Sequence, residues 1–200
     1  MRLTHLAAAV LVASAGASLF AAQQKPTAHE HETMKPLAEA TADIAGDGIT
    51  GTATLAEYQH GGSRLVQIHL TVSGLKPGQH GVHLHAVGKC EAPFESAGPH
   101  FNPGNHKHGI LSGEGHAGDM PNLHVPQSGE LSVEVVNSAI SLERGKPNSV
   151  FDNDGSSLVV HAKADDYKTD PAGNAGDRIA CGVIQQSGAA TVGSSPPPKQ

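Results

Sequence analysis

TGTATLAEYQHGGSRLVQIHLTVS, residues 50–73, is the stretch that decides the fold class. Apolar and polar side chains alternate through both of its halves, as expected for strands that bury one face. The HGG at 60–62 is a turn signal, because glycine adopts the positive φ angles that tight turns require. The sequence therefore predicts two strands joined by a short turn.

The same alternation recurs in five other segments, each short, rich in Val, Ile, Leu and Thr, and bounded by Gly, Asp, Asn or Pro. Two DG pairs, at 47–48 and 154–155, add turn signals. Seven or eight such strands without a convincing helix predict an all-β sandwich or flattened barrel. The five segments are LAEATADI (37–44), GVHLHAV (81–87), GELSVEVV (129–136), SLVVHA (157–162) and RIACGVI (178–184).

Composition narrows the class of function. The 24 Gly and 13 Pro among 200 residues indicate turns and loops rather than long helices. A formal net charge of -6 argues against nucleic acid as a partner. Histidine is the outlier, because its 14 copies exceed the 13 Lys and Arg combined. That excess suggests metal binding.

Residues 1–22 have the pattern of a signal peptide. Arg2 gives a basic start, and the stretch Leu6–Ala22 is apolar, uncharged and ends among small residues. Cleavage is expected between residues 17 and 22. A permanent membrane anchor is the alternative, although the run is short and weakly hydrophobic for a spanning helix. After removal of the peptide, the protein is expected in the periplasm or outside the cell. No stable membrane association is expected.

The remaining chain divides by composition into three parts. Residues 23–36 are polar with two prolines and predict a flexible linker, and 187–200 are Gly, Ser and Pro and predict a disordered tail. The folded domain is expected at 37–186. Within the linker, His29 and His31 form either an auxiliary copper or zinc site or part of a solvated segment.

Cys90 and Cys181 are the two cysteines of the chain. An exported protein meets an oxidising compartment, so a disulfide between them is expected. Two free buried thiols are the alternative. In the entropy model, a bridge that closes a loop of this size stabilises the fold by about 4–5 kcal/mol.

Residues 88–128 break the strand pattern with about forty residues of mainly Gly, Pro, His and Asn. His100, His108 and His116 occur at eight-residue intervals in it, and Asp119 follows three residues later. Three imidazoles and a carboxylate are a plausible tetrahedral zinc set, and a metal would offset the entropy of ordering this loop. A solvated loop with scattered histidines is the alternative.

A second set of histidines lies on predicted strands. His83 and His85 are two residues apart, so a strand directs both rings to one face. His161 ends another strand and, with His100, would complete four imidazoles, a set suited to copper. Asp165 could accept N–H bonds from ligand rings and fix their orientation. An HxH pair alone also arises by chance in a histidine-rich chain.

Six segments, taken in order, resemble the copper–zinc superoxide dismutases of the bacterial, exported type. The resemblance spans about residues 40–186 and implies a flattened eight-stranded Greek-key β-barrel. It departs from many members in the short DYKTDPA stretch between Asp165 and GNAG. The segments are GVHLH, SAGPHFNP, KHG, HAGD, LVVHAKADD and GNAGDRIACGVI.

The resemblance implies a role for each matching residue. His100 would be shared by both metals, and Asp165 would link His83 to His108. Arg178 would lie beside the copper at the mouth of the channel, His80 would support the HxH strand, and Cys90 and Cys181 would form the family disulfide. The implied copper ligands are His83, His85, His100 and His161, and the implied zinc ligands are His100, His108, His116 and Asp119.

The implied activity is conversion of superoxide to oxygen and hydrogen peroxide, with one copper and one zinc per subunit, as antioxidant defence in the cell envelope. A positive site must offset the net negative charge of the protein for an anionic substrate, and Arg178 is the candidate. The alternative is an exported copper- and zinc-binding protein on the same fold without catalysis. The resemblance leaves monomer and homodimer open.

Overall fold

The structure is a computed structural model that describes residues 34–187. The predicted signal peptide at 1–22, most of the predicted linker and the tail from residue 188 lie outside the described residues. Between residues 34 and 187, no helix is long and apolar enough to cross a membrane. The strands run from Ala38 to Gln186.

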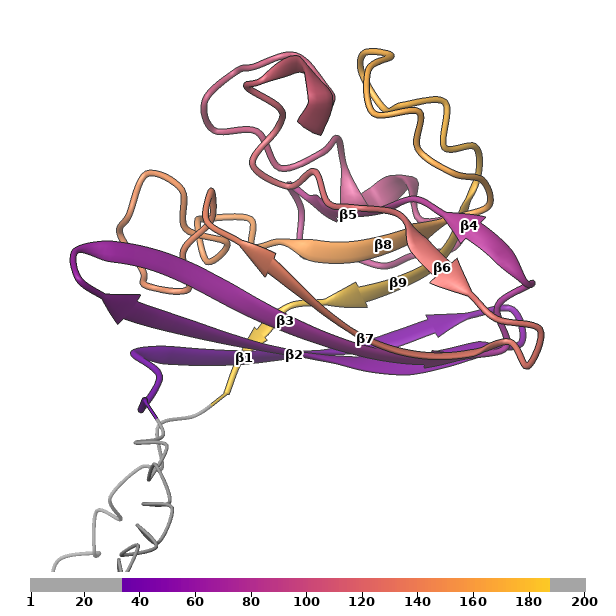
Figure 1. The fold of residues 1–200 in the computed structure, drawn as a ribbon, viewed down its shortest axis with the longest axis horizontal. Helices are drawn as coiled ribbons and strands as arrows, with labels where there is room; N and C mark the ends of the chain where they lie inside the picture. Colours follow the sequence, from indigo (N-terminus) through magenta and orange to yellow (C-terminus); the bar gives the residue numbers. More distant parts are fainter. Residues whose placement is uncertain (1–33, 188–200) are drawn as a thin grey trace, which may run out of the picture. The chain divides into compact units, whose positions relative to one another are not determined.

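The regular secondary structure of the described part is almost all β-strand, as the alternating pattern predicted (Figure 1). Its helical elements are two 3₁₀ turns, η1 (Glu95–Ala97) and η2 (Ile110–Ser112). The strands are β1 (Ala38–Gly46), β2 (Ile49–His60), β3 (Ser63–Ser73), β4 (Gly78–His80), β5 (Val82–His85), β6 (Leu123–Val125), β7 (Glu130–Asn137), β8 (Ser157–His161), β9 (Arg178–Val183) and β10 (Gln185–Gln186).

The stretch that decided the fold class forms a long antiparallel hairpin. β2 and β3 pair from Thr50–Ser73 to His60–Ser63, which leaves Gly61 and Gly62 as a two-residue turn. Their φ angles of 56° and 88° are accessible to glycine at little cost. The β1–β2 turn also has two residues, those of the first predicted DG pair, and of these only Gly48 has a positive φ, of 68°.

The sheet order gives the fold its Greek-key character. Eight strands form one antiparallel sheet in the order β5-β8-β9-β1-β2-β3-β7, with β10 paired to β1. β3 therefore pairs with β7 and β5 with β8, each across a long stretch of sequence. A separate ladder of β4 and β6 joins the two ends of the sheet, because β4 leads into β5 and β6 leads into β7. The all-β prediction is confirmed.

Side chains on the inner faces form the main apolar core, and a second, smaller cluster surrounds the disulfide. In the central hairpin, Leu55, Val66 and Ile68 are buried, at every second position of each strand. β8 is buried along its whole length, as expected for a strand covered on both sides. Such a core holds β5 and β8 in fixed positions, and both of these strands carry candidate site residues.

Glu57 is a charged exception in this core. Its side chain lies on the inner face of β2 and is 1% exposed. The carboxylate accepts hydrogen bonds from the Leu142 N–H at 2.7 Å, the Ser141 hydroxyl at 3.0 Å and Arg64 Nη1 at 3.3 Å. These donors replace the water that a buried carboxylate loses. Glu57 thereby anchors the β7–β8 connection to the hairpin.

Two long loops extend from the β5–β8 region (Figure 1). The first long loop, residues 86–122, connects β5 to β6, and the second long loop, residues 162–177, connects β8 to β9. Isolated bridges pair His85 with His100 and His83 with Asp119, which lays the first loop along β5. The predicted loop at 88–128 thus ends in a short strand, β6, that alternation over three residues could not reveal.

Candidate metal centre

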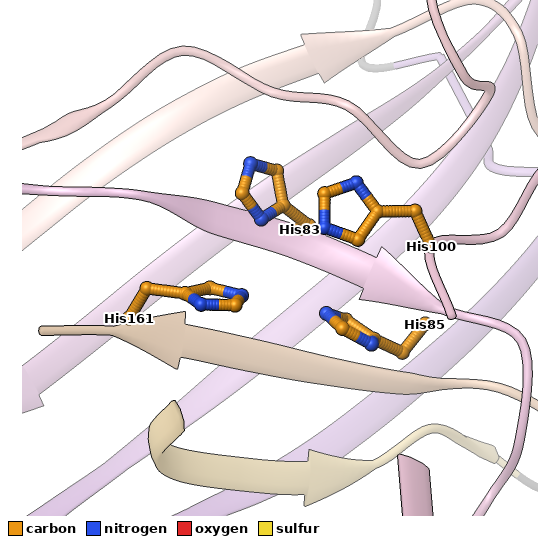
Figure 2. Close-up of side chains that lie close together, drawn as sticks. All are labelled: His83, His85, His100 and His161. Atoms are coloured by element: carbon orange, nitrogen blue, oxygen red, sulfur yellow. The ribbon is translucent and has the colours of Figure 1, made fainter. Parts of the chain in front are cut away.

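Neighbouring strands bring three of the predicted histidines together. His83 and His85 lie on β5, and His161 ends β8, its direct partner in the sheet. The ring of His161 lies with its centroid 4.9 Å from that of His83 and 5.6 Å from that of His85. His100 arrives from the first long loop beside His85. Figure 2 shows the four rings grouped around a common space.

Each ring in this first ligand group, His83, His85, His100 and His161, presents one free nitrogen. Four donor atoms lie within 4.8 Å of one another. All four rings are buried, and one nitrogen on each has no hydrogen-bond partner. A buried polar atom without a hydrogen-bond partner costs free energy of folding, so four of them around one point indicate a metal-binding site. The four atoms are His83 Nδ1, His85 Nε2, His100 Nε2 and His161 Nε2.

The opposite nitrogens of three of these rings are hydrogen-bonded, which fixes how the rings face. His83 Nε2 donates to Asp165 Oδ2 at 2.8 Å, and His85 Nδ1 donates to the Gly98 carbonyl at 2.9 Å. His161 Nδ1 donates to the Gly176 carbonyl at 3.2 Å. A ring that donates at one nitrogen keeps a lone pair at the other. All three lone pairs therefore face the common space.

The second ligand group consists of His100, His108, His116 and Asp119. Its donor atoms also lie within 4.8 Å of one another, and all four residues are buried. The carboxylate oxygen Asp119 Oδ1 lies 3.0 Å from both His100 Nδ1 and His108 Nδ1, and 3.5 Å from His116 Nδ1. The other oxygen, Oδ2, accepts the Gly109 and His116 N–H groups.

The chemistry of this second group fits a cation. His108 Nε2 donates to Asp165 Oδ1 at 3.0 Å, so the lone pair of His108 Nδ1 faces the Asp119 carboxylate. Two electron-rich atoms at 3.0 Å repel each other unless a proton or a metal cation lies between them, so this position suits a cation. Three imidazoles and one carboxylate are a set that zinc accepts.

His100 belongs to both groups. Its Nδ1 lies in the second group beside Asp119, and its Nε2 is the unpartnered nitrogen of the first. Asp165 joins the groups a second time, because it accepts from both His83 and His108. The Asp165 backbone is itself fixed by two hydrogen bonds with the Asn122 side chain, of 2.8 and 2.9 Å. The His100 ring and the Asp165 carboxylate thus connect the two candidate metal-binding sites.

Comparisons with known proteins identify the family. Residues 49–184 match the family model described as copper/zinc superoxide dismutase (SODC). Superoxide dismutase [Cu-Zn] 1 of Aquifex aeolicus is 49% identical over 138 residues, which cover 68% of this chain and 79% of the relative. The Caulobacter vibrioides superoxide dismutase [Cu-Zn] is 42% identical over 147 residues, covering 70% and 82%. This chain belongs to the copper/zinc superoxide dismutase family.

A solved structure is similar over most of the chain. The crystal structure of a double mutant of a SOD-like protein from Bacillus subtilis has a TM-score of 0.66 and 39% sequence identity to this chain. The match covers 72% of this chain and 95% of the other. Copper and zinc are the metals that family membership implies, and the two ligand groups are where the described residues could hold them.

Arg178 lies next to the first ligand group, at the start of β9. Its Nη1 donates to the Phe94 carbonyl at 2.7 Å and its Nη2 to the Gly98 carbonyl at 2.8 Å. Glu95 Oε2 lies 3.9 Å from Nη2. The Arg178 side chain is 16% exposed, so the guanidinium is fixed and still reached by solvent. The Gly98 carbonyl also accepts a hydrogen bond from His85. Arg178 and a candidate ligand therefore share one acceptor oxygen.

The predicted disulfide is confirmed. Cys90 and Cys181 are bonded, and they lie 91 residues apart in sequence. Cys90 precedes the carbonyls of Phe94 and Gly98, and Cys181 lies three residues after Arg178 on β9. The disulfide therefore links β9, which carries Arg178, to the part of the first long loop whose carbonyls accept hydrogen bonds from Arg178.

Burial keeps three rings of the first ligand group neutral, those of His83, His85 and His161. Desolvation lowers the pKa of His83 to about 4, that of His161 to about 3 and that of His85 to about 2. Desolvation alone would raise the pKa of the Asp119 carboxyl, but hydrogen bonds from His100 and the Gly109 N–H lower it below its usual range. Neutral imidazoles and an ionised carboxylate are the protonation states that metal ligands require.

These pKa shifts predict that the metal-free protein loses stability in mild acid. The unfolded rings titrate near the ordinary histidine pKa of 6.5, whereas the three folded rings titrate at about 4, 3 and 2. The unfolded chain therefore binds more protons below pH 6.5, and stability present above that pH is lost as the pH falls. We expect a loss of about 2 kcal/mol between pH 7 and pH 6 in urea unfolding of metal-free protein. A free energy of unfolding that does not change between pH 7 and pH 6 would contradict the lowered pKa values of these three rings.

His80, predicted as a support for the HxH strand, is buried between two carbonyls. Its Nδ1 lies 2.7 Å from the His161 carbonyl oxygen, and its Nε2 lies 2.8 Å from that of Lys76. The ring thus connects β4 to the end of β8, next to a candidate ligand.

Three groups that contact the candidate ligand residues have no sequence prediction. The carbonyls of Gly98 and Gly176 accept from the rings of His85 and His161. The Asp170 carboxylate accepts from the His108 backbone N–H and lies 3.9 Å from His116 Nε2.

Proposed function

We propose that this chain is a superoxide dismutase that converts two superoxide anions and two protons to oxygen and hydrogen peroxide. The observation that carries the proposal is the sharing of His100. One ring presents Nε2 to a group of four imidazoles and Nδ1 to a group with a carboxylate. Family membership supplies the reaction class, and the presence of both groups supports an active site rather than a remnant.

We assign copper to the all-imidazole group and zinc to the group that contains Asp119, with one of each per chain. Four nitrogens suit copper, and a set of nitrogen and carboxylate ligands suits zinc. The assigned copper ligands are His83, His85, His100 and His161, and the assigned zinc ligands are His100, His108, His116 and Asp119. Copper bound there would supply the one-electron redox couple that this reaction needs.

The protein's own residues supply position and protons. Asp165, Gly98 and Gly176 hold the ligand rings so that no ring must reorient during the reaction. His100 can hold a proton at Nε2 while Nδ1 stays in the second group. A proton on His100 Nε2 lies beside the assigned copper ligands. Peroxide formed at that site needs a proton, and His100 can donate it.

Arg178 is the proposed binding residue for the anion. The chain carries a net charge of -6, which repels superoxide at long range. The guanidinium is held by two backbone carbonyls beside the copper group, and a guanidinium can attract and hydrogen-bond a small anion. A local positive charge at this point offsets the repulsion.

An Arg178→Ala variant is expected to lose about tenfold in kcat/KM, because local steering of an anion contributes about tenfold or more. The slope of the rate against ionic strength should also flatten, since salt screens the lost attraction. Stopped-flow or pulse-radiolysis kinetics over a salt series measures both. Arg144→Ala is the matched control, because Arg144 contacts Gln186 and Phe151 rather than site residues. Equal salt dependence in wild type and Arg178→Ala would contradict the steering role.

The decisive test of the function uses full-length mature protein loaded with copper and zinc. We expect superoxide consumption far above that of the same concentration of free copper, and a copper EPR spectrum that changes when zinc is removed. Metal binding without turnover would favour the alternative of a metal-binding protein on this fold. A spectrum indifferent to zinc would contradict the shared role of His100.

We also propose that the chain acts in the periplasm or outside the cell. The predicted signal peptide at 1–22 and the disulfide both favour an oxidising compartment. N-terminal sequencing of the protein from the native host tests this, with a mature terminus expected after a residue between 17 and 22. An intact Met1 would contradict export by cleavage.

A further inference from the structure

Asp170 contacts two residues of the second ligand group from outside it. Its Oδ1 accepts a hydrogen bond from the His108 backbone N–H at 2.8 Å. The same oxygen lies 3.9 Å from His116 Nε2, within ion-pair distance. Asp170 belongs to the second long loop, whereas both histidines belong to the first. One carboxylate thus reaches the backbone of one candidate zinc ligand and the ring of another.

His116 is the ring that most needs such a partner. Its side chain is 7% exposed, and its Nδ1 has no hydrogen-bond partner and lies 3.5 Å from Asp119 Oδ1. To offer a lone pair at Nδ1, the neutral ring must carry its proton at Nε2. A carboxylate beside Nε2 favours that tautomer, because it attracts the N–H dipole.

The other ligand rings already have outer partners. Asp165 accepts from His83 and His108, and the carbonyls of Gly98 and Gly176 accept from His85 and His161. His100 needs none, because both of its nitrogens face ligand groups. His116 would be the one ligand ring without an outer acceptor, and Asp170 is the carboxylate beside it.

We propose that Asp170 is a positioning residue for zinc. It sets the tautomer of His116 through Nε2, fixes the His108 backbone, and thereby ties the second long loop to the zinc ligands. The inference rests on the proposed zinc site, but it concerns a residue outside the ligand set. It predicts an effect on zinc binding that can be measured without turnover.

The test compares Asp170→Asn and Asp170→Ala with wild type in the full mature chain. Asn keeps an oxygen for the His108 N–H and removes the charge beside His116, whereas Ala removes both. Asp152→Asn is the matched control, because Asp152 borders the same hollow as Asp170 and His116 and its carboxylate accepts from Asp154. Zinc affinity is measured by competition with a chelator, and the His116 tautomer by ¹⁵N NMR of the metal-free protein.

We expect zinc affinity to fall about tenfold in Asp170→Asn and up to about 100-fold in Asp170→Ala, the range for outer partners of ligand histidines. The His116 ¹⁵N shifts should move away from the Nε2–H tautomer in both variants, and Asp152→Asn should match wild type. Affinities within twofold of wild type in both variants would overturn the proposal, as would a loss confined to Asp170→Ala with unchanged ¹⁵N shifts. Failure of wild type to bind zinc would instead overturn the proposed function.

Discussion

A His161→Ala variant is expected to lose more than about 100-fold in superoxide turnover while keeping its fold. His161 supplies one of the four nitrogens of the proposed copper site, and loss of a direct ligand should cost more than the 10–100-fold typical of an outer partner. The alanine also removes a buried ring from the end of β8, so some stability is lost. Turnover, copper content and the copper EPR spectrum of the reloaded variant measure the effect.

His124→Ala serves as the control for that variant. His124 lies on β6 with an exposed side chain, and it belongs to neither ligand group. We expect wild-type turnover and copper content from it. Turnover of His161→Ala within tenfold of wild type at full copper loading would contradict the assignment of the copper ligands.

Removing the disulfide is expected to lower the free energy of unfolding by about 4 kcal/mol, since the bridge closes a loop of 91 residues. The variant is Cys90→Ser combined with Cys181→Ser. Activity should fall as well, because residues 90–98 then lose their covalent tie to β9 and the acceptors of Arg178 lose their fixed position. Urea unfolding of the metal-free double variant and turnover of its loaded form are the measurements.

Wild type treated with a reductant is the control for the disulfide variant. It should reproduce both losses, and reoxidation should restore both. A change in the free energy of unfolding below about 1 kcal/mol in the double variant would contradict a stabilising role for the bridge.

The strands could be predicted because one physical rule sets them. All seven segments with alternating side chains became strands, since a sheet with one buried face requires apolar residues at every second position. The Asp-Gly and Gly-Gly turns were predictable because their φ angles favour glycine. The three-residue strands β4 and β6 were not, because so few residues cannot establish a period.

Glu57 marks the limit of that rule. Alternation along β2 assigns it to the inner face, yet a carboxylate is expected in solvent. Its burial depends on donors from Ser141 and Leu142, more than eighty residues away in sequence. No local pattern predicts a hydrogen bond formed only when the β7–β8 connection returns to the hairpin.

The candidate ligand residues could be predicted from the sequence, whereas the groups that orient them could not. Histidine spacing predicted both ligand groups, because imidazole is a common metal ligand and its spacing can be read from the sequence. The atoms that hold those rings include the carbonyls of Gly98 and Gly176, and every residue has a carbonyl. Asp170 was an ordinary acidic residue in the sequence until the fold brought it to His108 and His116.

The Gly98 carbonyl makes two properties of the site inseparable. Residue 98 has a φ of 74°, and a Cβ there would lie 2.8 Å from Val87 Cγ2, so glycine alone fits without strain. Any substitution that shifts this oxygen moves the acceptor of His85 and that of Arg178 together. If His85 and Arg178 have the roles proposed above, metal binding and anion binding would therefore change together, and a mutation at this position could not alter one alone.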